Sequence, residues 1–351
     1  MAKTVAVIPG DGIGPEVIDA ALDVLDALDL DIDYLHASAG LACYQREGAY
    51  LPEATLTAVR AADAVLFGAI TSPLDVKDYT SVILALRQEL DAYANVRPAR
   101  DYGQPCKAPG LDIVLVRENT EGMYNALEVE DADGVTTMRR ITRRGSQRIT
   151  RFALELAKKQ KRSRVTCLHK ANVLRKSDAL FRRVFYEEAH ALHVERDASL
   201  AAVGKPLRGA SSQTPLPKAD DMLLDNAALQ LVLNPQRFDV LVTMNLYGDV
   251  LSDEIAGLVG GLGFAPSGSY GPRAALFEPV HGSAPDIAGK EVANPTGAIL
   301  SAAMMLEYLG EAKEARRVEA AVRAALAEGR TSDAGGELGT SEFTALVVRA
   351  L

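Results

Sequence analysis

Two carboxylates four residues apart, Asp249 and Asp253, are the residues of this 351-residue chain best placed to do chemistry. They follow the apolar run 238–244, which is typical of a buried strand, and Gly248 is interpreted as the break after which a helix begins. On a helix, two carboxylates at this spacing share one face and repel each other. A hard divalent cation, Mg²⁺ or Mn²⁺, would offset that repulsion. The alternative is a solvated first helical turn, where the helix dipole favours acids.

Three arginines come near the ends of successive predicted elements. Arg87 lies in a helical pattern over roughly 80–92, Arg97 precedes a proline in an extended segment, and Arg117 closes a predicted buried strand. If the three guanidinium groups converge, they would bind substrate carboxylates bidentately. The alternative for each arginine is an ordinary surface salt bridge.

Two further sites follow predicted strands. Lys170 comes directly after the strand 165–169 and could act as a base if its surroundings lower its pKa; the alternative is a plain surface lysine. The glycine-rich segment 9–15 follows the strand 4–8. Its spacing, GDGIG, departs from the GxGxxG of a Rossmann dinucleotide loop, and a tight strand-to-helix turn explains it equally well.

The middle of the chain carries three more predicted elements. Residues 126–144 alternate polar and apolar around Asp133-Gly134, which predicts a β-hairpin arm suited to subunit contact. Residues 197–219 lack periodicity and are interpreted as a long surface loop. The segment 220–232, which carries Asp225, is predicted to be helical.

The composition excludes several classes of protein. A net charge of −9 and a pI of about 5.2 argue against nucleic acid or an anionic membrane as partner. Three widely spaced cysteines without a CxxC motif indicate reduced thiols rather than a disulfide framework or a zinc site. No apolar run reaches transmembrane length and the N-terminus does not have the layout of a signal peptide, so we expect a cytoplasmic protein.

Six ordered motifs resemble the β-decarboxylating dehydrogenases, the family of isocitrate, homoisocitrate, 3-isopropylmalate and tartrate dehydrogenases. The motifs are IPGDGIGPEV at 8–17, ANVRPA at 94–99, VRENTEGMY at 116–124, HKANVL at 169–174, NLYGDVLSD at 245–253 and FEPVHGSAPDIAGKEVANPTGAILSAAMML at 277–306. The resemblance implies an α/β isocitrate/isopropylmalate dehydrogenase-like fold, not a Rossmann fold, with two domains and a cleft between them. One domain would combine 1–98 with 256–351, and the other would be 99–255, carrying the arm and the dimer contacts. It also implies a homodimer, or a tetramer, with shared active sites.

The resemblance also assigns roles to residues. Asp249 and Asp253, with Asp225 from the partner subunit, match metal ligands for Mg²⁺ or Mn²⁺. Lys170, also from the partner, matches the general base, and Tyr124 the acid that protonates the enolate. The residues that match substrate contacts are Ser72, Ser81, Arg87, Arg97, Arg117, Tyr124, Lys170 and Asn172. Those that match cofactor contacts are Ile70, Thr71, Ser72, Asn172, His281, Gly282, Ser283, Ala284, Pro285, Asp286 and Asn294.

Asp286 bears on the choice of cofactor. A carboxylate accepts hydrogen bonds from ribose hydroxyls and repels a 2′-phosphate, so NAD is expected rather than NADP. The NADP enzymes of the family carry a lysine and a tyrosine where this chain has Asp286 and Ile287.

The resemblance implies that the substrate is a malate substituted at C3, and the segment 78–87 bears on the substituent. Ser81, six residues before Arg87, matches a serine that contacts the distal carboxylate of isocitrate, whereas Ile83-Leu84 could imitate the leucine pair of isopropylmalate enzymes. Bacterial homoisocitrate enzymes carry an arginine at the position of Leu84, so here the distal carboxylate would fall to Ser72, Ser81, Lys77 or Tyr79.

We rank homoisocitrate first, with 2-oxoadipate as product as in lysine biosynthesis, then isocitrate, then 3-isopropylmalate. A dual homoisocitrate/isocitrate enzyme is a further alternative. A non-catalytic regulatory subunit is the alternative outside enzymes, and the presence of the metal aspartates, the lysine and the tyrosine argues against it.

Overall fold

A computed structural model describes residues 2–73, 79, 81–202 and 216–351, and for residues 196–202 it describes the backbone only. The chain divides into two compact units. Unit 1 comprises Met1–Gly110 and Asp253–Leu351, and unit 2 comprises Leu111–Ser252. The segments before and after unit 2 in the sequence both belong to unit 1. Unit 1 is therefore discontinuous in sequence, whereas unit 2 is continuous.

Unit 1 is built on strands in the order β2-β1-β3-β12-β11-β4, where β11 is antiparallel to both its neighbours and the other pairs are parallel. Its strands are β1 (Lys3–Gly10), β2 (Ile32–His36), β3 (Ala64–Ala69), β4 (Ala94–Arg100), β11 (Pro266–Tyr270) and β12 (Ala275–Pro279). Its helices are α1 (Gly14–Asp26), α2 (Leu41–Glu47), α3 (Glu53–Ala61), α4 (Val82–Glu89), α9 (Thr296–Tyr308), α10 (Ala312–Glu328) and α11 (Thr340–Arg349).

Helices cover both faces of the unit 1 sheet at β1 and β3, so these two strands are apolar along most of their length. In β1, Val5 and Val7 pack into the core formed with α1, α9, α10 and α11. The alternate residues, Ala6 and Ile8, pack into a second core with α3 and α4 on the opposite face. The side chains of a strand point alternately to the two faces, so one apolar run supplies both cores.

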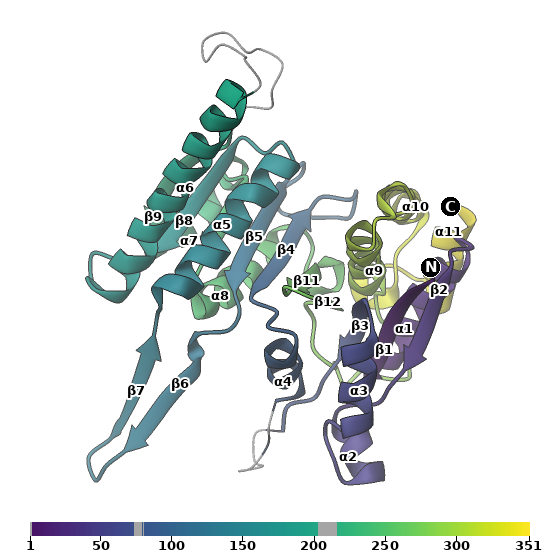
Figure 1. Ribbon diagram of the computed structural model, residues 1–351. Coiled ribbons are helices and arrows are strands. Elements are labelled where there is room, and N and C mark those ends of the chain that lie inside the picture. Colours follow the sequence, from purple (N-terminus) through teal and green to yellow (C-terminus); the bar gives the residue numbers. More distant parts are fainter. Residues whose placement is uncertain (1, 74–78, 80, 203–215) are drawn as a thin grey trace. The chain divides into compact units, whose positions relative to one another are not determined.

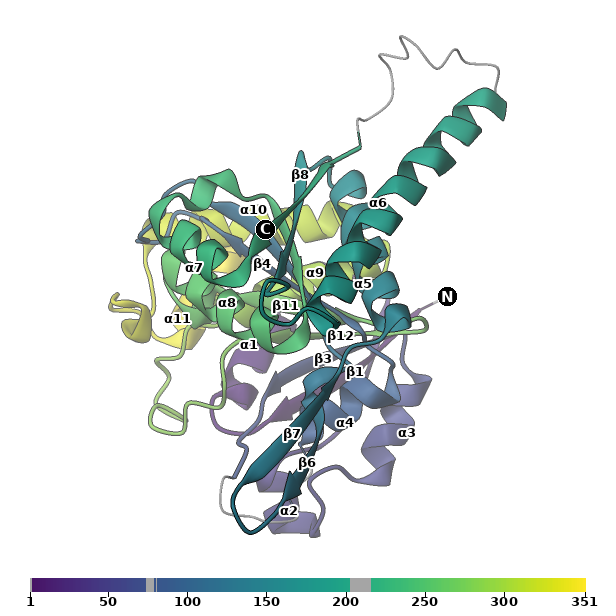
Figure 2. The ribbon, with the colours of Figure 1, turned by 90° about the vertical axis from the view of Figure 1, so that its left-hand side faces the viewer.

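Unit 2 has a fully parallel sheet in the order β5-β10-β8-β9, with α5 and α6 along one face and α7 and α8 on the other (Figures 1 and 2). Its strands are β5 (Asp112–Glu118), β8 (Arg164–His169), β9 (Lys218–Leu223) and β10 (Val240–Thr243). Its helices are α5 (Arg143–Lys159), α6 (Ser177–Ala202), α7 (Leu224–Leu233) and α8 (Asn245–Leu258), which crosses into unit 1. In a parallel sheet the carboxyl ends of all strands lie at one edge, and this edge carries the residues discussed below.

A two-stranded hairpin projects from unit 2 (Figure 1). Strand β6 (Gly122–Glu130) pairs antiparallel with β7 (Val135–Arg140), and Asp131 Oδ1 accepts hydrogen bonds from the peptide N–H groups of Asp133 and Gly134 in the turn. The predicted hairpin arm and its turn are confirmed. We call this hairpin, residues 122–140, the arm.

Three local predictions were wrong. Gly248 lies inside α8 and does not mark the start of the helix, because the helix already begins at Asn245. The predicted loop 197–219 is helical up to Ala202 and extended from Lys218; residues 203–215 lie outside the described part. The first residues of the predicted helix 220–232 belong to β9, because Asp220 and Asp221 bond to side chains of β8 and α6.

The unit boundaries also differ from the predicted ones at 98/99 and 255/256. They fall after Gly110 and before Asp253. The segment after β4 stays with unit 1 because the Gln104 side chain donates to the carbonyl of Val259, and the peptide N–H of Lys107 donates to the carbonyl of Leu258.

The remaining global expectations concern cysteines and membranes. Cys43, Cys106 and Cys167 are free thiols, as predicted. Burial raises the pKa of Cys167, so this thiol is unreactive. Within the described ranges, no helix combines the length and the apolar character that crossing a bilayer requires.

Candidate functional site

The carboxyl edge of the unit 2 sheet gathers three of the predicted residues. Arg117 is the second-to-last residue of β5, Lys170 follows β8 directly, and α8, which carries Asp249, starts two residues after β10. All three strands are parallel and in register, so these segments emerge at the same edge. The local fold thus brings polar groups together at the end of an apolar sheet, which is the arrangement of a ligand site.

Arg117 is a fully buried cation held in one orientation. Its Nε and one terminal nitrogen donate to Asn245 Oδ1 at 3.0 and 2.8 Å, and another terminal nitrogen pairs with Asp249. The Tyr124 hydroxyl also donates to Asp249, and the Arg117 guanidinium lies 4.9 Å from the centre of the Tyr124 ring. A carboxylate, a phenol and a guanidinium therefore form one cluster, which we call the Asp249 cluster, consisting of Arg117, Tyr124, Asn245 and Asp249.

The protonation of this cluster suits proton donation. Burial and the hydrogen bond to Asp249 raise the pKa of Tyr124, so the phenol keeps its proton at neutral pH. Tyr124 is also more than a third exposed, so its hydroxyl group is within reach of a ligand.

Gly248 is required for the cluster to form. A Cβ at this position would lie 2.7 Å from Cγ and 2.8 Å from Cβ of Arg117. Only glycine lets α8 approach the Arg117 side chain so closely. The glycine that was interpreted as the break before the helix is a residue within α8 that packs against Arg117.

Lys170 and Asp225 form a second pair at this edge of unit 2. The Lys170 ammonium donates to Asp225 Oδ1 at 2.6 Å, and this hydrogen bond lowers the pKa of Asp225. The Asp225 side chain is about two-thirds exposed. Asn172, two residues beyond Lys170, is exposed as well. These two predicted residues, the base and a metal ligand, are thus brought together on the surface of one chain.

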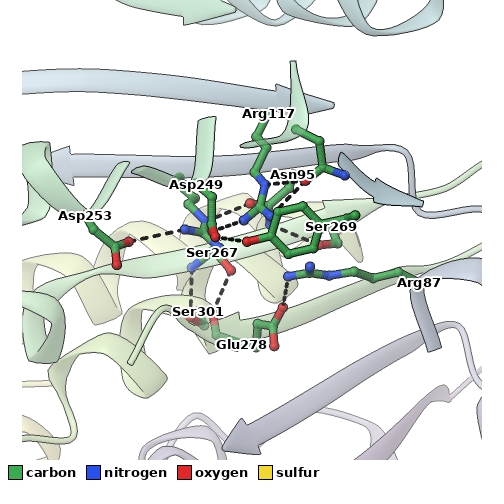
Figure 3. A network of polar contacts seen from close by, with 12 residues as sticks. Arg87, Asn95, Arg117, Asp249, Asp253, Ser267, Ser269, Glu278 and Ser301 are labelled. Carbon is green, nitrogen blue, oxygen red and sulfur yellow. Dashed lines mark hydrogen bonds and ion pairs between the residues drawn. The ribbon is translucent and has the colours of Figure 1, made fainter. Parts of the chain in front are cut away.

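In unit 1, two predicted arginines are buried and oriented by fixed partners. Arg87, near the end of α4, pairs with Glu278 of β12 at 2.9 Å (Figure 3). In β4, Arg97 Nε donates to Asn95 Oδ1 at 2.7 Å, and a terminal nitrogen lies 3.5 Å from Asp253. Neither arginine is an exposed surface residue, which excludes the alternative of a solvated salt bridge for both.

The helix α4 presents the residues that were expected to sense the substrate. Ser81, Leu84 and Arg87 follow each other at a spacing of three, so they lie along one side of the helix. Ile83 packs against the second core of unit 1. Ser81 is the N-cap residue of α4, yet its side chain makes no capping hydrogen bond. Lys77 lies outside the described residues.

Two other residues were expected to meet a distal carboxylate. Ser72 is exposed. Tyr79 packs edge-on against Tyr50, whose ring stacks on Tyr44. The Tyr79 hydroxyl is buried, and no hydrogen-bond partner for it exists among the described residues.

The glycine-rich turn at 9–15 is a docking point for the loop at 281–286. Gly10 and Gly12 have positive φ angles of 79° and 61°. A Cβ on Gly12 would lie 1.9 Å from the carbonyl oxygen of Ser283, which accepts from the peptide N–H of Ile13. The tight turn is therefore confirmed, and its close neighbour is protein backbone.

The same region brings together most of the predicted cofactor residues. Thr71 Oγ1 donates to Ser283 Oγ at 2.7 Å, and the peptide N–H of Thr71 donates to Asp11. Ile70 is half-buried beside them. The loop itself is partly or fully exposed at His281, Gly282, Ala284, Pro285 and Asp286.

His281 and Asn294 are suited to contact a nucleotide. His281 Nδ1 bonds to the carbonyl oxygen of Gly282, and burial lowers the pKa of His281, so the ring is neutral with its proton on Nδ1. His281 Nε2 is then an acceptor, buried and unpartnered among the described residues. Asn294 is buried, with Oδ1 accepting the peptide N–H of Thr296. An orphaned buried acceptor, on the same loop as the exposed Asp286, fits a cofactor that carries amino and hydroxyl groups.

The acidic residues fit a hard divalent cation by their chemistry. Asp249 and Asp253 lie one turn apart on α8, and Asp225 lies on α7. All three side chains are partly exposed. Carboxylate oxygens are the donors that Mg²⁺ and Mn²⁺ prefer. In the part of the chain that is described, no three acidic, histidine or cysteine side chains gather closely enough to hold a metal ion.

Four residues with clear positions at the site were missed by sequence reasoning. Each lies inside one of the motifs quoted above, which was the only available signal. Asn245 orients Arg117, Glu278 pairs with Arg87, and Asn95 holds Arg97. Asp11 accepts three backbone N–H groups, those of Leu41, Ala42 and Thr71.

Comparison with known proteins gives one consistent result. The family described as isocitrate/isopropylmalate dehydrogenase matches residues 4–347. The chain is 48% identical to a 3-isopropylmalate dehydrogenase from Methanothermobacter thermautotrophicus, over 99% of this chain and 98% of that protein. It is also 48% identical to an isocitrate/homoisocitrate dehydrogenase from Thermus thermophilus, over 100% of this chain and 99% of that protein. Identity therefore does not discriminate between the substrates of these relatives.

Solved structures agree with the fold. The chain superposes on the crystal structure of isocitrate dehydrogenase from Methylococcus capsulatus with a TM-score of 0.88 and 40% identity, covering 99% of both chains. The predicted fold class is thereby confirmed.

Proposed function

The chain belongs to the isocitrate/isopropylmalate dehydrogenase family, and on that premise we propose that it oxidises and decarboxylates homoisocitrate with NAD as hydride acceptor. The coarser statement is established by membership: the protein is an oxidoreductase that oxidatively decarboxylates a 3-substituted malate. The observation that carries the assignment of residues is the Asp249 cluster, where a proton-bearing phenol and a buried guanidinium meet one carboxylate.

Arg87, Arg97 and Arg117 bind the carboxylates of the substrate in this proposal. Each guanidinium is buried and oriented in advance, by Glu278, Asn95 and Asn245 respectively. Side chains that are already ordered lose little conformational entropy on binding, and a desolvated guanidinium binds a carboxylate more strongly than an exposed one does.

Lys170 takes the proton from the C2 hydroxyl group, and Tyr124 protonates the enolate carbon after CO₂ has left. Tyr124 meets the requirement for an acid, since burial and Asp249 keep its proton in place by raising its pKa. Asn172 is assigned to the space between substrate and nicotinamide. When bound, the metal would supply Lewis-acid polarisation of the hydroxyl and carboxylate oxygens, held by Asp249 and Asp253 with Asp225 of a second copy.

We propose that two copies of the chain share their active sites. Lys170 is partly exposed and is paired with the exposed Asp225, so the two can reach a second copy together. The surface around them is apolar: Leu229, Val232 and Leu233 of α7 and Val250 of α8 are all more than half exposed. Leu127 and Val135 of the arm are about 60% exposed as well. A stable dimer would bury such side chains, and a tetramer could follow from pairs of dimers.

The preference for NAD rests on Asp286. Its carboxylate is exposed on the loop that also presents His281, and it would repel a 2′-phosphate. Ile287, where NADP enzymes of the family carry a tyrosine, packs against the core of unit 1 and is not available to a phosphate.

The preference for homoisocitrate or isocitrate over isopropylmalate rests on α4. An isopropyl group needs an apolar patch, but Ile83 is committed to the core, so Leu84 is the one apolar member of the pair on the same side as Arg87. Ser81 on that side has a hydroxyl group that its own helix does not use. A polar substituent therefore finds a donor there, and an alkyl group finds a smaller patch than two leucines would provide.

The test is a substrate panel. Homoisocitrate, isocitrate and 3-isopropylmalate are each assayed by NADH or NADPH absorbance, with Mg²⁺ and with Mn²⁺. We expect the highest kcat/KM with homoisocitrate and NAD, with isocitrate second. The highest kcat/KM with 3-isopropylmalate would overturn the substrate proposal. Absence of turnover with every acid and both cofactors would favour the alternative of a regulatory subunit.

A further inference from the structure

Asp178 is a fully buried carboxylate in the first turn of α6, and it holds the backbone of Lys170. Its side chain has no exposed surface. Asp178 Oδ2 accepts the peptide N–H of Lys170 at 2.8 Å, across eight residues of chain. The peptide group fixed in this way belongs to the residue proposed as the general base.

A buried carboxylate is costly unless its charge is compensated, and here the compensation comes from the arm. Arg139, near the end of β7, pairs with Asp178 Oδ1 and also donates to Ser177 Oγ at 2.8 Å. The same guanidinium lies 5.8 Å from the centre of the Tyr247 ring on α8. Asp178 therefore connects the base of the arm to the backbone of Lys170.

The residue before Lys170 is fixed as firmly. His169 is buried; its Nδ1 accepts the peptide N–H of Ala171 at 3.1 Å, so Nε2 carries the ring proton and donates to Asp221 Oδ2 at 2.9 Å. Arg182 of α6 pairs with Asp221 in turn. Two carboxylates, each neutralised by an arginine, thus hold the chain on either side of the Lys170 Cα. The Lys170 ammonium, by contrast, has only the exposed Asp225 as its partner among the described contacts.

We propose that Asp178 is a positioning residue for Lys170 and that Arg139 ties the position of Lys170 to the arm. This inference rests on the proposed function, in which Lys170 takes the proton of the C2 hydroxyl group. The Asp178 carboxylate does not act on the substrate; it fixes the peptide group from which the Lys170 side chain starts. Arg139 sets where that carboxylate lies, so whatever holds the arm, including a second copy of this chain, also holds Lys170.

The expected size of the effect follows from how sensitive proton transfer is to geometry. A displacement of about 1 Å in a catalytic group can cost about 10²-fold in rate. Asp178→Ala removes the acceptor of the Lys170 N–H and the carboxylate that pairs with Arg139. We expect kcat to fall about 10- to 100-fold, with KM for the hydroxy acid and for NAD within about twofold of the wild type.

The conservative variant separates positioning from general damage. Asp178→Asn keeps a carbonyl oxygen for the Lys170 N–H and loses the ion pair with Arg139, so we expect it to recover most of kcat. It also serves as the test if Asp178→Ala does not fold. Arg139→Met keeps Asp178 itself and should lower kcat by a smaller factor than Asp178→Ala.

Asp239 provides a matched control in the same unit. It too accepts a backbone N–H, from Ser163 at 2.6 Å, and pairs with an arginine, Arg162, at 3.1 Å, but it lies at the amino end of the sheet. Asp239→Ala should lower the thermal midpoint as Asp178→Ala does and leave kcat within about twofold.

A double-mutant cycle with Lys170→Met completes the test. If Asp178 acts through Lys170, Asp178→Ala has little further effect, within about twofold, on the residual rate of Lys170→Met. The proposal is overturned if Asp178→Ala keeps full kcat, or if it lowers the rate equally in both backgrounds. If Lys170→Met itself turns over like the wild type, the proposed function has failed; if Lys170→Met is impaired and Asp178→Ala is not, only this inference has failed.

Discussion

The two ends of the unit 2 sheet both carry networks of charged side chains. The networks differ in whether the charged groups pair only with one another or also include exposed groups that a ligand could contact. At the amino end, Arg162 pairs with Asp112, the first residue of β5, and with Asp239, which directly precedes β10; Ser163 also donates to Asp239. At the carboxyl end, the buried Arg117 leads outward to Asp249 and to the partly exposed Tyr124.

This difference indicates which of the two charged networks is suited to bind a ligand. The amino-end network joins three strand starts and satisfies its own charges. At the carboxyl end, the Asp249 cluster leads from the buried Arg117 to the partly exposed Tyr124, and the second pair leads from Lys170 to the exposed Asp225. Parallel sheets bind ligands at their carboxyl ends, and here the charges themselves show why: the inner groups are oriented by the fold and the outer ones are left for a ligand.

The largest expected effect is a loss of turnover when a residue at the carboxyl end of the unit 2 sheet is changed. Lys170→Met at the carboxyl end should lower kcat by about 10²- to 10⁴-fold, because the general base is removed. Steady-state kinetics with the best substrate and NAD checks this. A Lys170→Met enzyme with kcat above a tenth of the wild type would contradict the comparison.

The next effect falls on stability alone. Arg162→Ala at the amino end leaves the Asp112 and Asp239 carboxylates without their shared partner, and we expect a loss of about 3 kcal/mol in the free energy of unfolding. Urea denaturation followed by circular dichroism measures it. Since the network touches no proposed substrate contact, kcat and KM should stay within about twofold; a tenfold change in KM would show that this end also serves the reaction.

A smaller effect combines both properties at one position. Gly248→Ala would place a methyl group against the Arg117 side chain, and relief of this clash should cost about 2 kcal/mol of stability. The displaced Arg117 should also raise KM for the hydroxy acid. Gly257→Ala is the matched control on the same helix, because nothing lies within 4 Å of a Cβ there. Equal KM values for the two variants would argue against a substrate role for Arg117.

The smallest effect is a dependence of stability on pH. Burial opposes ionisation of Asp221, but hydrogen bonds from Arg182, Tyr186 and His169 outweigh it and lower the pKa of Asp221 from 3.8 to about 2. A depressed pKa stabilises the fold above the unfolded value, so this contribution, about 1 kcal/mol, is present above pH 4 and is lost as the pH falls toward 2. Asp221→Asn should be less stable than the wild type at pH 6. The gap between their unfolding midpoints should narrow between pH 4 and pH 2.

Several strands, and the positions of the candidate site residues beside them, could be predicted because these signals are local. Lys170 follows an apolar run that forms a buried strand, Arg117 lies at the end of another, and Asp249 and Asp253 keep helical spacing. Gly248 was misread because its role depends on Arg117, which is 131 positions away in the chain and packs against it only in the folded unit. The strand β9 was missed for a related reason: Asp220 and Asp221 oppose strand structure by themselves, and Thr166, His169 and Arg182 compensate them through tertiary contacts.

The partners of the arginines could not be predicted at all. Glu278 and Asn95 stand in motifs where every polar residue is an equal candidate, and spacing does not say which carboxylate faces Arg87. Which polar residue of such a motif orients an arginine becomes visible only when distances are known.

The discontinuity of unit 1 has a consequence for how the chain is made. Strands β3 and β4 are close in sequence but are separated in their sheet by β12 and β11, which come from the second segment. During synthesis, the first segment therefore leaves the ribosome with two unpaired strand edges, and it must wait for residues up to Pro279 to be translated. The strands of unit 2 all come from one continuous segment, so unit 2 can fold during this delay. We therefore expect unit 2 to fold before unit 1 is complete.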